Sequence, residues 1–322
     1  YMGIRSLKSA SVSTGTKRSK FWDQSATTAP TFTLRTSLPS AANWNDVAWN
    51  GTYYVTVACY ASNKSAYSSN GTSWTASTLP TTNSWNNITY DSTNGRFIAT
   101  CNGSATAYST NGTSWSAGGN TSNSNWTDQE TNSSGVTVCP AAAYAPTQNN
   151  ICWSTDGGSN WSSVGVGASP IRPWSVAWGA SIWVITPLGG RDTWTSTNGS
   201  TWTTRTNALP VSDNWVVFFG TGKFVALPAS TSTTGAYSTD GITWTSSTIP
   251  AAVTGWYDGD YGNSIFMSCD YGSANVITSS DGVTWTKRTT PSNLNSINTK
   301  YVNNQFMIMP GDSSSTNYIT SP

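Results

Sequence analysis

The segment SSNGTSW (68–74) recurs along the chain in five variants: STNGTSW (109–115), STDGGSNW (154–161), STNGSTW (196–202), STDGITW (238–244) and SSDGVTW (279–285). The final tryptophans are 41, 46, 41, 42 and 41 residues apart. A fixed period of this size is typical of propellers and solenoids. Each box has the chemistry of a tight hairpin, because Asn-Gly or Asp-Gly supplies the positive φ angles of a two-residue turn and the tryptophan can pack between strands.

Strand-like segments surround each box and make a unit of four strands. An inner strand, such as VAWN ending at Asn50 or SVAW ending at Trp178, precedes a second strand such as YYVTVA or IWVIT, and the box joins the third strand to the fourth. Four strands in about forty-two residues form one propeller blade. We therefore predict an all-β fold, a seven-bladed β-propeller over residues 31–322.

The ends of the chain predict how the ring closes. Phe32 lies forty-two residues before Trp74, so the chain begins with a fourth strand, and NYITSP (317–322) resembles a third strand. We predict that Thr31 to Thr36 pairs with Asn317 to Thr320 and completes the last blade. Closure of this kind removes free sheet edges.

STDGGSNW, with Ser154, Asp156, Gly158 and Trp161, resembles the Asp box of the sialidase-like, or BNR-repeat, propellers. In that family the boxes lie on hairpins away from the catalytic centre, so the resemblance implies a scaffold. A sialidase also needs an arginine cluster, a tyrosine activated by a glutamate and an aspartic acid. This chain has one glutamate, Glu130, and its arginines Arg35, Arg96, Arg172, Arg191, Arg205 and Arg288 are spread around the ring.

Composition argues against an enzyme. The chain contains no histidine, so the most common general base and metal ligand is missing. Charged residues make up 9% of the chain, and Cys59, Cys101, Cys139 and Cys269 have the positions of buried apolar residues. We expect no catalytic residues, no metal and no cofactor.

The first thirty residues differ from the rest. Five basic residues precede the first acid, Asp23, and the remainder has ten basic and fourteen acidic residues. The segment MGIRSLKSASVSTGTKRS (2–19) resembles the openings of some tailed-phage virion proteins. We interpret residues 1–30 as a basic, extended arm that docks on other virion proteins. Its basic residues are Arg5, Lys8, Lys17, Arg18 and Lys20.

Two sets of residues are candidates for binding. Alignment of Trp49, Tyr261 and Tyr301 predicts a polar cluster in the channel, formed by Asp46, Asp258, Asp260 and Lys300, for which the alternative is solvated residues in a wet channel. The second set is a tryptophan at the entry to six inner strands, which either stacks on sugar rings or fills the core between blades. These residues are Trp44, Trp85, Trp126, Trp174, Trp215 and Trp256.

Three functions remain open. The first is a non-enzymatic structural or adhesion protein of a tailed-phage virion, with the propeller projecting outward for receptor binding. The second is a lectin-like propeller that binds cell-surface glycans, and the third is a sialidase-type hydrolase. We expect a virion location, and otherwise an extracellular or cell-surface one. The first thirty residues contain no apolar core of a signal peptide and the chain contains no membrane-length apolar run, which argues against export by the general route. We expect no nucleic-acid partner and no membrane insertion.

Overall fold

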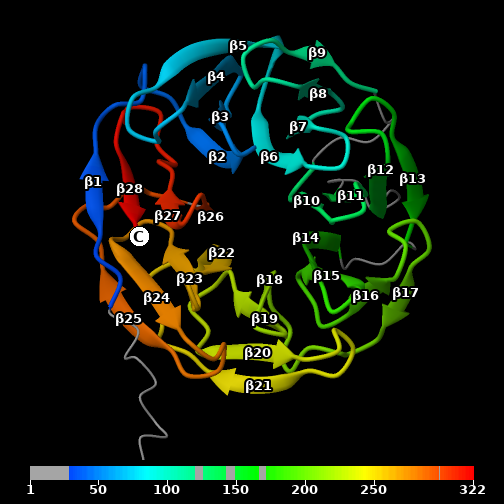
Figure 1. Cartoon of the computed structure of the whole chain (residues 1–322). Helices are drawn as coiled ribbons and strands as arrows, with labels where there is room; N and C mark the ends of the chain where they lie inside the picture. Colours follow the sequence, from blue (N-terminus) through cyan, green and yellow to red (C-terminus); the bar gives the residue numbers. More distant parts are fainter. Residues whose placement is uncertain (1–28, 120–125, 143–148, 167–171, 297) are drawn as a thin grey trace, which may run out of the picture.

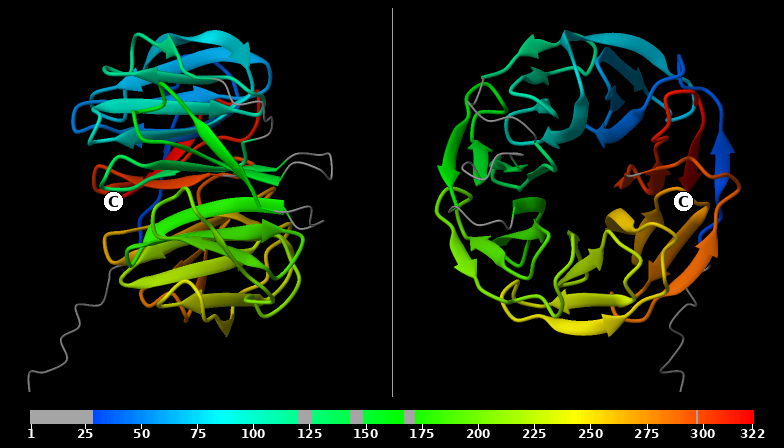
Figure 2. Two further views of the ribbon diagram at one scale, coloured as in Figure 1. Left: turned by 90° about the vertical axis from the view of Figure 1, so that its right-hand side faces the viewer. Right: turned by 180° about the vertical axis from the view of Figure 1, so that it is seen from behind.

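A closed ring of β-sheets surrounds a central channel (Figure 1). The computed structural model describes residues 29–119, 126–142, 149–166, 172–296 and 298–322. Within these residues, 28 strands form seven four-stranded sheets, and no helix occurs. The prediction of an all-β, seven-bladed propeller is confirmed, and Figure 2 shows the blades from the side and from behind.

Each blade is an antiparallel meander whose first strand lines the channel and whose fourth strand lies at the rim. Blades 1 to 3 follow each other along the chain. Their strands are β2 (Trp44–Trp49), β3 (Tyr54–Ala58), β4 (Ser62–Ser68) and β5 (Thr75–Asn83); β6 (Trp85–Asp91), β7 (Arg96–Cys101), β8 (Thr106–Ser109) and β9 (Ser116–Ala117); and β10 (Glu130–Thr131), β11 (Thr137–Ala142), β12 (Asn149–Ser154) and β13 (Ser162–Gly165).

Blades 4 to 6 repeat this order. Their strands are β14 (Arg172–Gly179), β15 (Ile182–Leu188), β16 (Thr193–Ser196) and β17 (Thr203–Arg205); β18 (Trp215–Gly220), β19 (Lys223–Pro228), β20 (Thr234–Ser238) and β21 (Thr245–Thr248); and β22 (Trp256–Gly262), β23 (Ile265–Asp270), β24 (Asn275–Ser279) and β25 (Thr286–Thr289).

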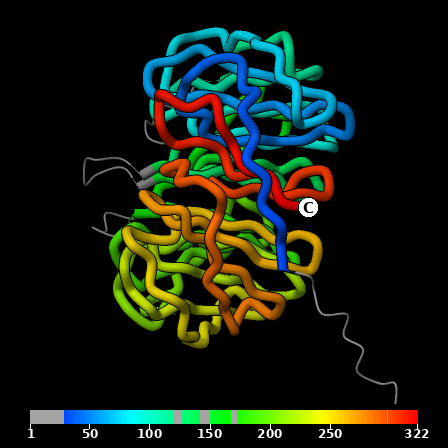
Figure 3. Tube along the Cα trace, turned by 90° about the vertical axis from the view of Figure 1, so that its left-hand side faces the viewer, coloured from blue at the N-terminus to red at the C-terminus, as the bar shows by residue number. Residues whose placement is uncertain are grey.

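The seventh blade combines both ends of the chain, as the sequence predicts. It contains β26 (Thr299–Val302), β27 (Gln305–Ile308), β28 (Tyr318–Ser321) and, as its outer strand, β1 (Thr33–Arg35). Thr33 pairs with Thr320 and Arg35 with Tyr318. Figure 3 shows the blue N-terminal strand beside the red C-terminal strand. This pairing removes the sheet edge that an open ring would expose.

The box hairpins are longer than the two-residue turn that the sequence predicts: in the fifth blade, residues 239–244 connect β20 to β21, and Gly241 but not Asp240 has a positive φ. In the fifth blade, Asp240 Oδ1 accepts hydrogen bonds from the amides of Ile242 and Thr243 at 2.8 and 2.7 Å. Gly241 has a φ of +71°, and a Cβ there would lie 2.5 Å from Val184 of the preceding blade. Glycine is therefore needed both for the turn and for close contact between blades.

The interpretation of four cysteines as buried small residues agrees with the structure, in which Cys59, Cys101, Cys139 and Cys269 are all buried. The basic arm, with Arg5, Lys8, Lys17, Arg18 and Lys20, lies outside the described residues. No helix in the described part of the chain is long and apolar enough to cross a membrane.

Candidate functional site

Two hollows occupy the two ends of the channel. One, of about 250 Å³, lies between the last residues of the inner strands and is lined by Trp49, Tyr90 and Lys300 among others. The other, of about 280 Å³, lies at the face where the inner strands begin, and we call it the entry-face basin. Its lining is Asn45, Cys59, Tyr60, Ser84, Asn86, Asn87, Asn102, Trp126, Thr127, Asp128, Arg172, Trp174, Ser175, Leu188, Val216, Tyr257, Asp258 and Asn298.

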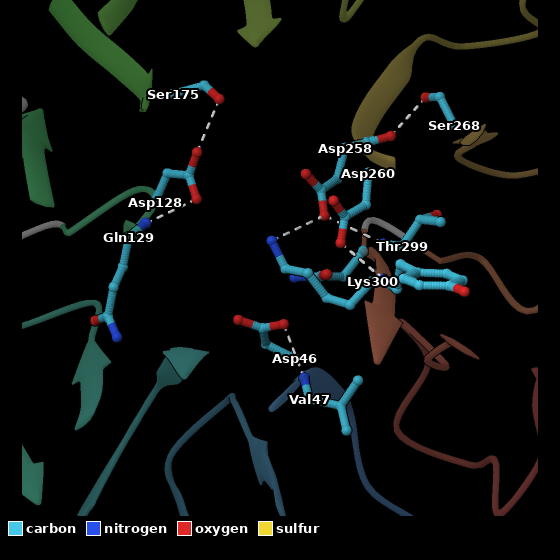
Figure 4. A network of polar contacts seen from close by, with 12 residues as sticks. Asp46, Val47, Asp128, Gln129, Ser175, Asp258, Asp260, Ser268, Thr299 and Lys300 are labelled. Atoms are coloured by element: carbon cyan, nitrogen blue, oxygen red, sulfur yellow. Dashed lines mark hydrogen bonds and ion pairs between the residues drawn. The ribbon is translucent and has the colours of Figure 1, made fainter. Parts of the chain in front are cut away.

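The predicted polar cluster is assembled in the channel, as Figure 4 shows. The ammonium group of Lys300 lies 3.5 Å from Asp258 Oδ2. Asp46 of the first blade and Asp260 of the sixth are close enough to act electrostatically on Lys300. The structure thus brings together all four residues that the sequence alignment selected.

The carboxylates of this cluster connect neighbouring blades. Asp46, Asp258 and Asp260, together with Asp128 of the third blade, each accept a main-chain hydrogen bond from the inner strand of the next blade around the ring. Three of these four acceptors occupy equivalent positions, because Asp46, Asp128 and Asp258 lie three residues before Trp49, Thr131 and Tyr261. The amides of Ile88, Val176, Thr299 and Tyr301 donate to Asp46, Asp128, Asp258 and Asp260 over 2.9, 2.9, 3.1 and 2.7 Å, respectively.

Burial and the interactions among neighbouring charges shift the pKa values in this cluster. Burial raises the pKa of Asp46 to about 6, that of Asp258 to about 7 and that of Glu130 to about 8, although Lys300 lowers each of them. Burial also lowers the pKa of Lys300, but the carboxylates, Asp258 foremost, outweigh it and hold this pKa well above its usual value. Lys300 is therefore charged at neutral pH and offsets the acids around it.

Asp128 and Glu130 belong to the channel, and the alignment missed them. The alignment relied on an aromatic residue near the end of each inner strand, such as Trp49 or Tyr261. The third blade has Thr131 at this position, so its inner strand could not be aligned in the same way. The tryptophan at 126 is the remaining signal, because counting two and four residues from it reaches both acids.

The entry-face basin is lined by residues at β-bulges. In blades 1, 2, 4 and 6 the pairing of the first two strands shifts by one residue near the start of the inner strand. A bulge leaves one residue unpaired and re-aims its side chain. The bulge residues are Asn45, Asn86, Trp174 and Tyr257, and all four line the basin.

Of the two alternatives for the entry tryptophans, the structure shows the core alternative for five of the six, and the sugar-facing alternative is wrong for these five. Trp44, Trp85, Trp126, Trp215 and Trp256 are at most 1% exposed, because they fill the hydrophobic core within and between blades. Trp174 differs from these five. It is itself the bulge residue of its strand, whereas Trp44 immediately precedes the bulge residue of the first blade. Its side chain is only partly buried and lines the basin.

Tyr60, like the bulge residues Asn45, Asn86 and Tyr257, lines the basin and was missed by sequence reasoning. It lies in the loop between β3 and β4, is 72% exposed and has a φ of +62°. Large aromatic side chains are rarely this exposed, and a non-glycine residue in the left-handed region stores strain. No sequence pattern marks it, because neither its exposure nor its backbone angle leaves a periodic signal.

The basin lacks the arginine cluster of a sialidase. Among its lining residues, Arg172 is the one arginine. Arg205 and Arg288 lie on outer strands, where they bond to Thr195 and Thr278, and Arg96 stacks on Tyr108. Within the described residues, no three His, Cys, Asp or Glu side chains are placed to hold a metal ion.

The fold has many structural relatives. Virginiamycin B lyase from Staphylococcus aureus shares 11% identity over 90% of this chain and 99% of its own, with a TM-score of 0.76. YCF48 bound to D1 peptide shares 15% identity over 90% and 96%, with a TM-score of 0.66, and YCF48 from Cyanidioschyzon merolae shares 13% over 90% and 98%, with a TM-score of 0.67. No protein-family model and no curated protein matches the sequence. At these identities the likeness shows the propeller fold alone.

Proposed function

We propose that this protein is a non-enzymatic recognition module of a tailed-phage particle, which docks through residues 1–30 and presents the entry-face basin to a partner. The structural relatives include both a lyase and YCF48 in complex with a peptide, so the choice between catalysis and binding depends on the residues of this chain.

The use of the channel carboxylates carries the proposal. A general acid or base needs a carboxyl group that can reach substrate and exchange a proton with it. Asp46 and Asp258 instead each accept a main-chain amide of the next blade, and Asp258 also pairs with Lys300. These groups already have structural partners, whereas the basin is lined mainly by amides, hydroxyls and aromatic rings.

The particle location rests on sequence. The basic arm resembles virion-protein openings, and the chain has few charges and many Ser, Thr and Asn residues. The lectin-like alternative with one tryptophan site per blade loses its basis, because five of those tryptophans are buried. A single shared basin takes its place as the recognition site.

Removal of residues 1–25 tests the docking role. We expect the truncated protein to fold, because β1 is retained, and to be absent from purified particles when it is the only copy expressed. The full chain expressed in the same way serves as the control. Incorporation of the truncated protein at the level of the full chain would refute docking through the arm.

A further inference from the structure

We propose that the entry-face basin binds a neutral glycan, with Tyr60 as an aromatic platform for a sugar ring. This inference rests on the proposed function, because it names the class of ligand for the same basin.

Amide side chains give the basin its hydrogen-bonding capacity. A carboxamide both donates and accepts, which matches the hydroxyl groups of a sugar, and five asparagines line the basin. Asn298 is only 8% exposed, and its Oδ1 has no hydrogen-bond partner among the described residues. A buried amide oxygen without a partner is costly, so a ligand hydroxyl that reached the Asn298 side chain would satisfy it.

Aromatic rings gather on one side of the basin. Tyr257, from the bulge of the sixth blade, lies with its ring 5.5 Å from that of Tyr271, which is 38% exposed. Tyr271 is one of the groups near Tyr60 that raise its pKa, after Cys59 and burial. Trp174 adds an indole to the basin lining. Rings of this kind offer large, rigid apolar faces, which suit the CH-rich faces of sugars.

The loop that carries Tyr60 presents its side chain at the rim of the basin. Both Tyr60 and Ala61 have positive φ, at 62° and 51°, although neither is glycine. Two consecutive positive-φ residues also form the turns at Ala180 and Ser181 and at Asn303 and Asn304, so the pair at Tyr60 and Ala61 is a turn conformation. This turn holds a tyrosine side chain, 72% exposed, at the rim of a hollow.

The charges of the basin favour a neutral ligand. Asp128 Oδ2 accepts hydrogen bonds from Ser175 Oγ and Val176 N, and its Oδ1 accepts one from Gln129 N. Asp258 is held by Thr299 and Lys300. With its two acids engaged and one arginine in the lining, the basin has no group of charges that selects an ionic ligand.

The volume of about 280 Å³ is at the small end of ligand pockets, which span about 300–1,000 Å³. The basin therefore suits one end or one short segment of a glycan. Binding would be weak for one propeller and strong for many propellers on one particle.

The experiment uses the full chain, biotinylated and assembled on streptavidin, on an array of neutral and sialylated glycans that includes bacterial polysaccharides, with a peptide array beside it. Tyr60→Ala and Asn86→Ala change the basin. Ile242→Ala removes a side chain of 37% exposure from a box hairpin at the opposite end of its blade and serves as the matched control. Melting curves verify that all variants fold.

We expect wild type and Ile242→Ala to bind the same neutral glycans, and Tyr60→Ala to bind about tenfold more weakly, as for the loss of one stacked ring. Binding of sialylated glycans alone, equal binding by Tyr60→Ala, or no glycan binding would overturn the inference. Peptide binding that depends on Tyr60 would refute a glycan as the ligand of the basin, but it would still agree with the proposed recognition function. Incorporation of the protein into particles is measured in the separate truncation experiment. A failure of docking can therefore be distinguished from a failure of glycan binding.

Discussion

Closure of the ring by β1 can be tested with two truncations that differ by twelve residues. The chain 26–322 keeps β1, whereas the chain 38–322 removes it and leaves β28 as an exposed edge. Both chains retain Leu38, which is buried in the core and is the first residue of the shorter one.

The magnitude follows from the contacts of this strand. The chain 38–322 loses three residue pairs with β28, the bond from Arg35 Nε to Thr320 and the packing of partly buried Phe32 on the core of the seventh blade. A half-buried phenylalanine and several hydrogen bonds together contribute about 3–5 kcal/mol. At about 2–4 °C per kcal/mol, the melting temperature should fall by roughly 6–20 °C.

Thermal unfolding followed by circular dichroism, with light scattering for aggregation, measures this difference. We expect 26–322 to melt like the full chain, and 38–322 to melt earlier and to aggregate through its open edge. If the two truncated chains melt alike, β1 does not close the ring and the reasoning is refuted.

Two further predictions concern the interior. Tyr318→Phe should lower the free energy of unfolding in urea by about 1–3 kcal/mol, because the buried hydroxyl donates to Gly71 O at 2.6 Å and accepts from Trp74 Nε1 at 3.1 Å; an unchanged value would contradict this pairing. The melting temperature should fall as pH rises from about 5 to 8.5. Burial raises the pKa of Glu130 to about 8 and that of Asp258 to about 7 in the folded state. The stability that is present below the unfolded pKa values of these acids is therefore lost as they ionise in the folded protein. Glu130→Gln should flatten that dependence, and an equally steep profile would assign it to other groups.

The repeat made the architecture predictable from sequence. Each box fixes a turn by local chemistry, with Asp-Gly or Asn-Gly at the same place, so strand order and closure follow from counting. Asp46, Asp258, Asp260 and Lys300 were found because aromatic residues mark the ends of their strands.

The basin could not be predicted in the same way. Trp174 is one residue out of step with Trp44 and the other core tryptophans, and only the observed strand pairing places it at a bulge. A tryptophan at the start of a strand has the same sequence signal whether it fills the core or faces a hollow. Tyr60 lies in a loop between two strands, where no periodic pattern marks its exposure or its backbone conformation.

The central claim, recognition at the entry face without chemistry, is tested most directly by incubating the purified protein with a mixed library of glycans and peptides and analysing the retained and free fractions by mass spectrometry. The account predicts a retained fraction of unchanged mass that is strongly reduced with Tyr60→Ala, in line with about tenfold weaker binding, and persists with Ile242→Ala. New, shorter products that form with wild type and vanish with Asp258→Asn would contradict it, because they would make the channel carboxylate a catalytic group.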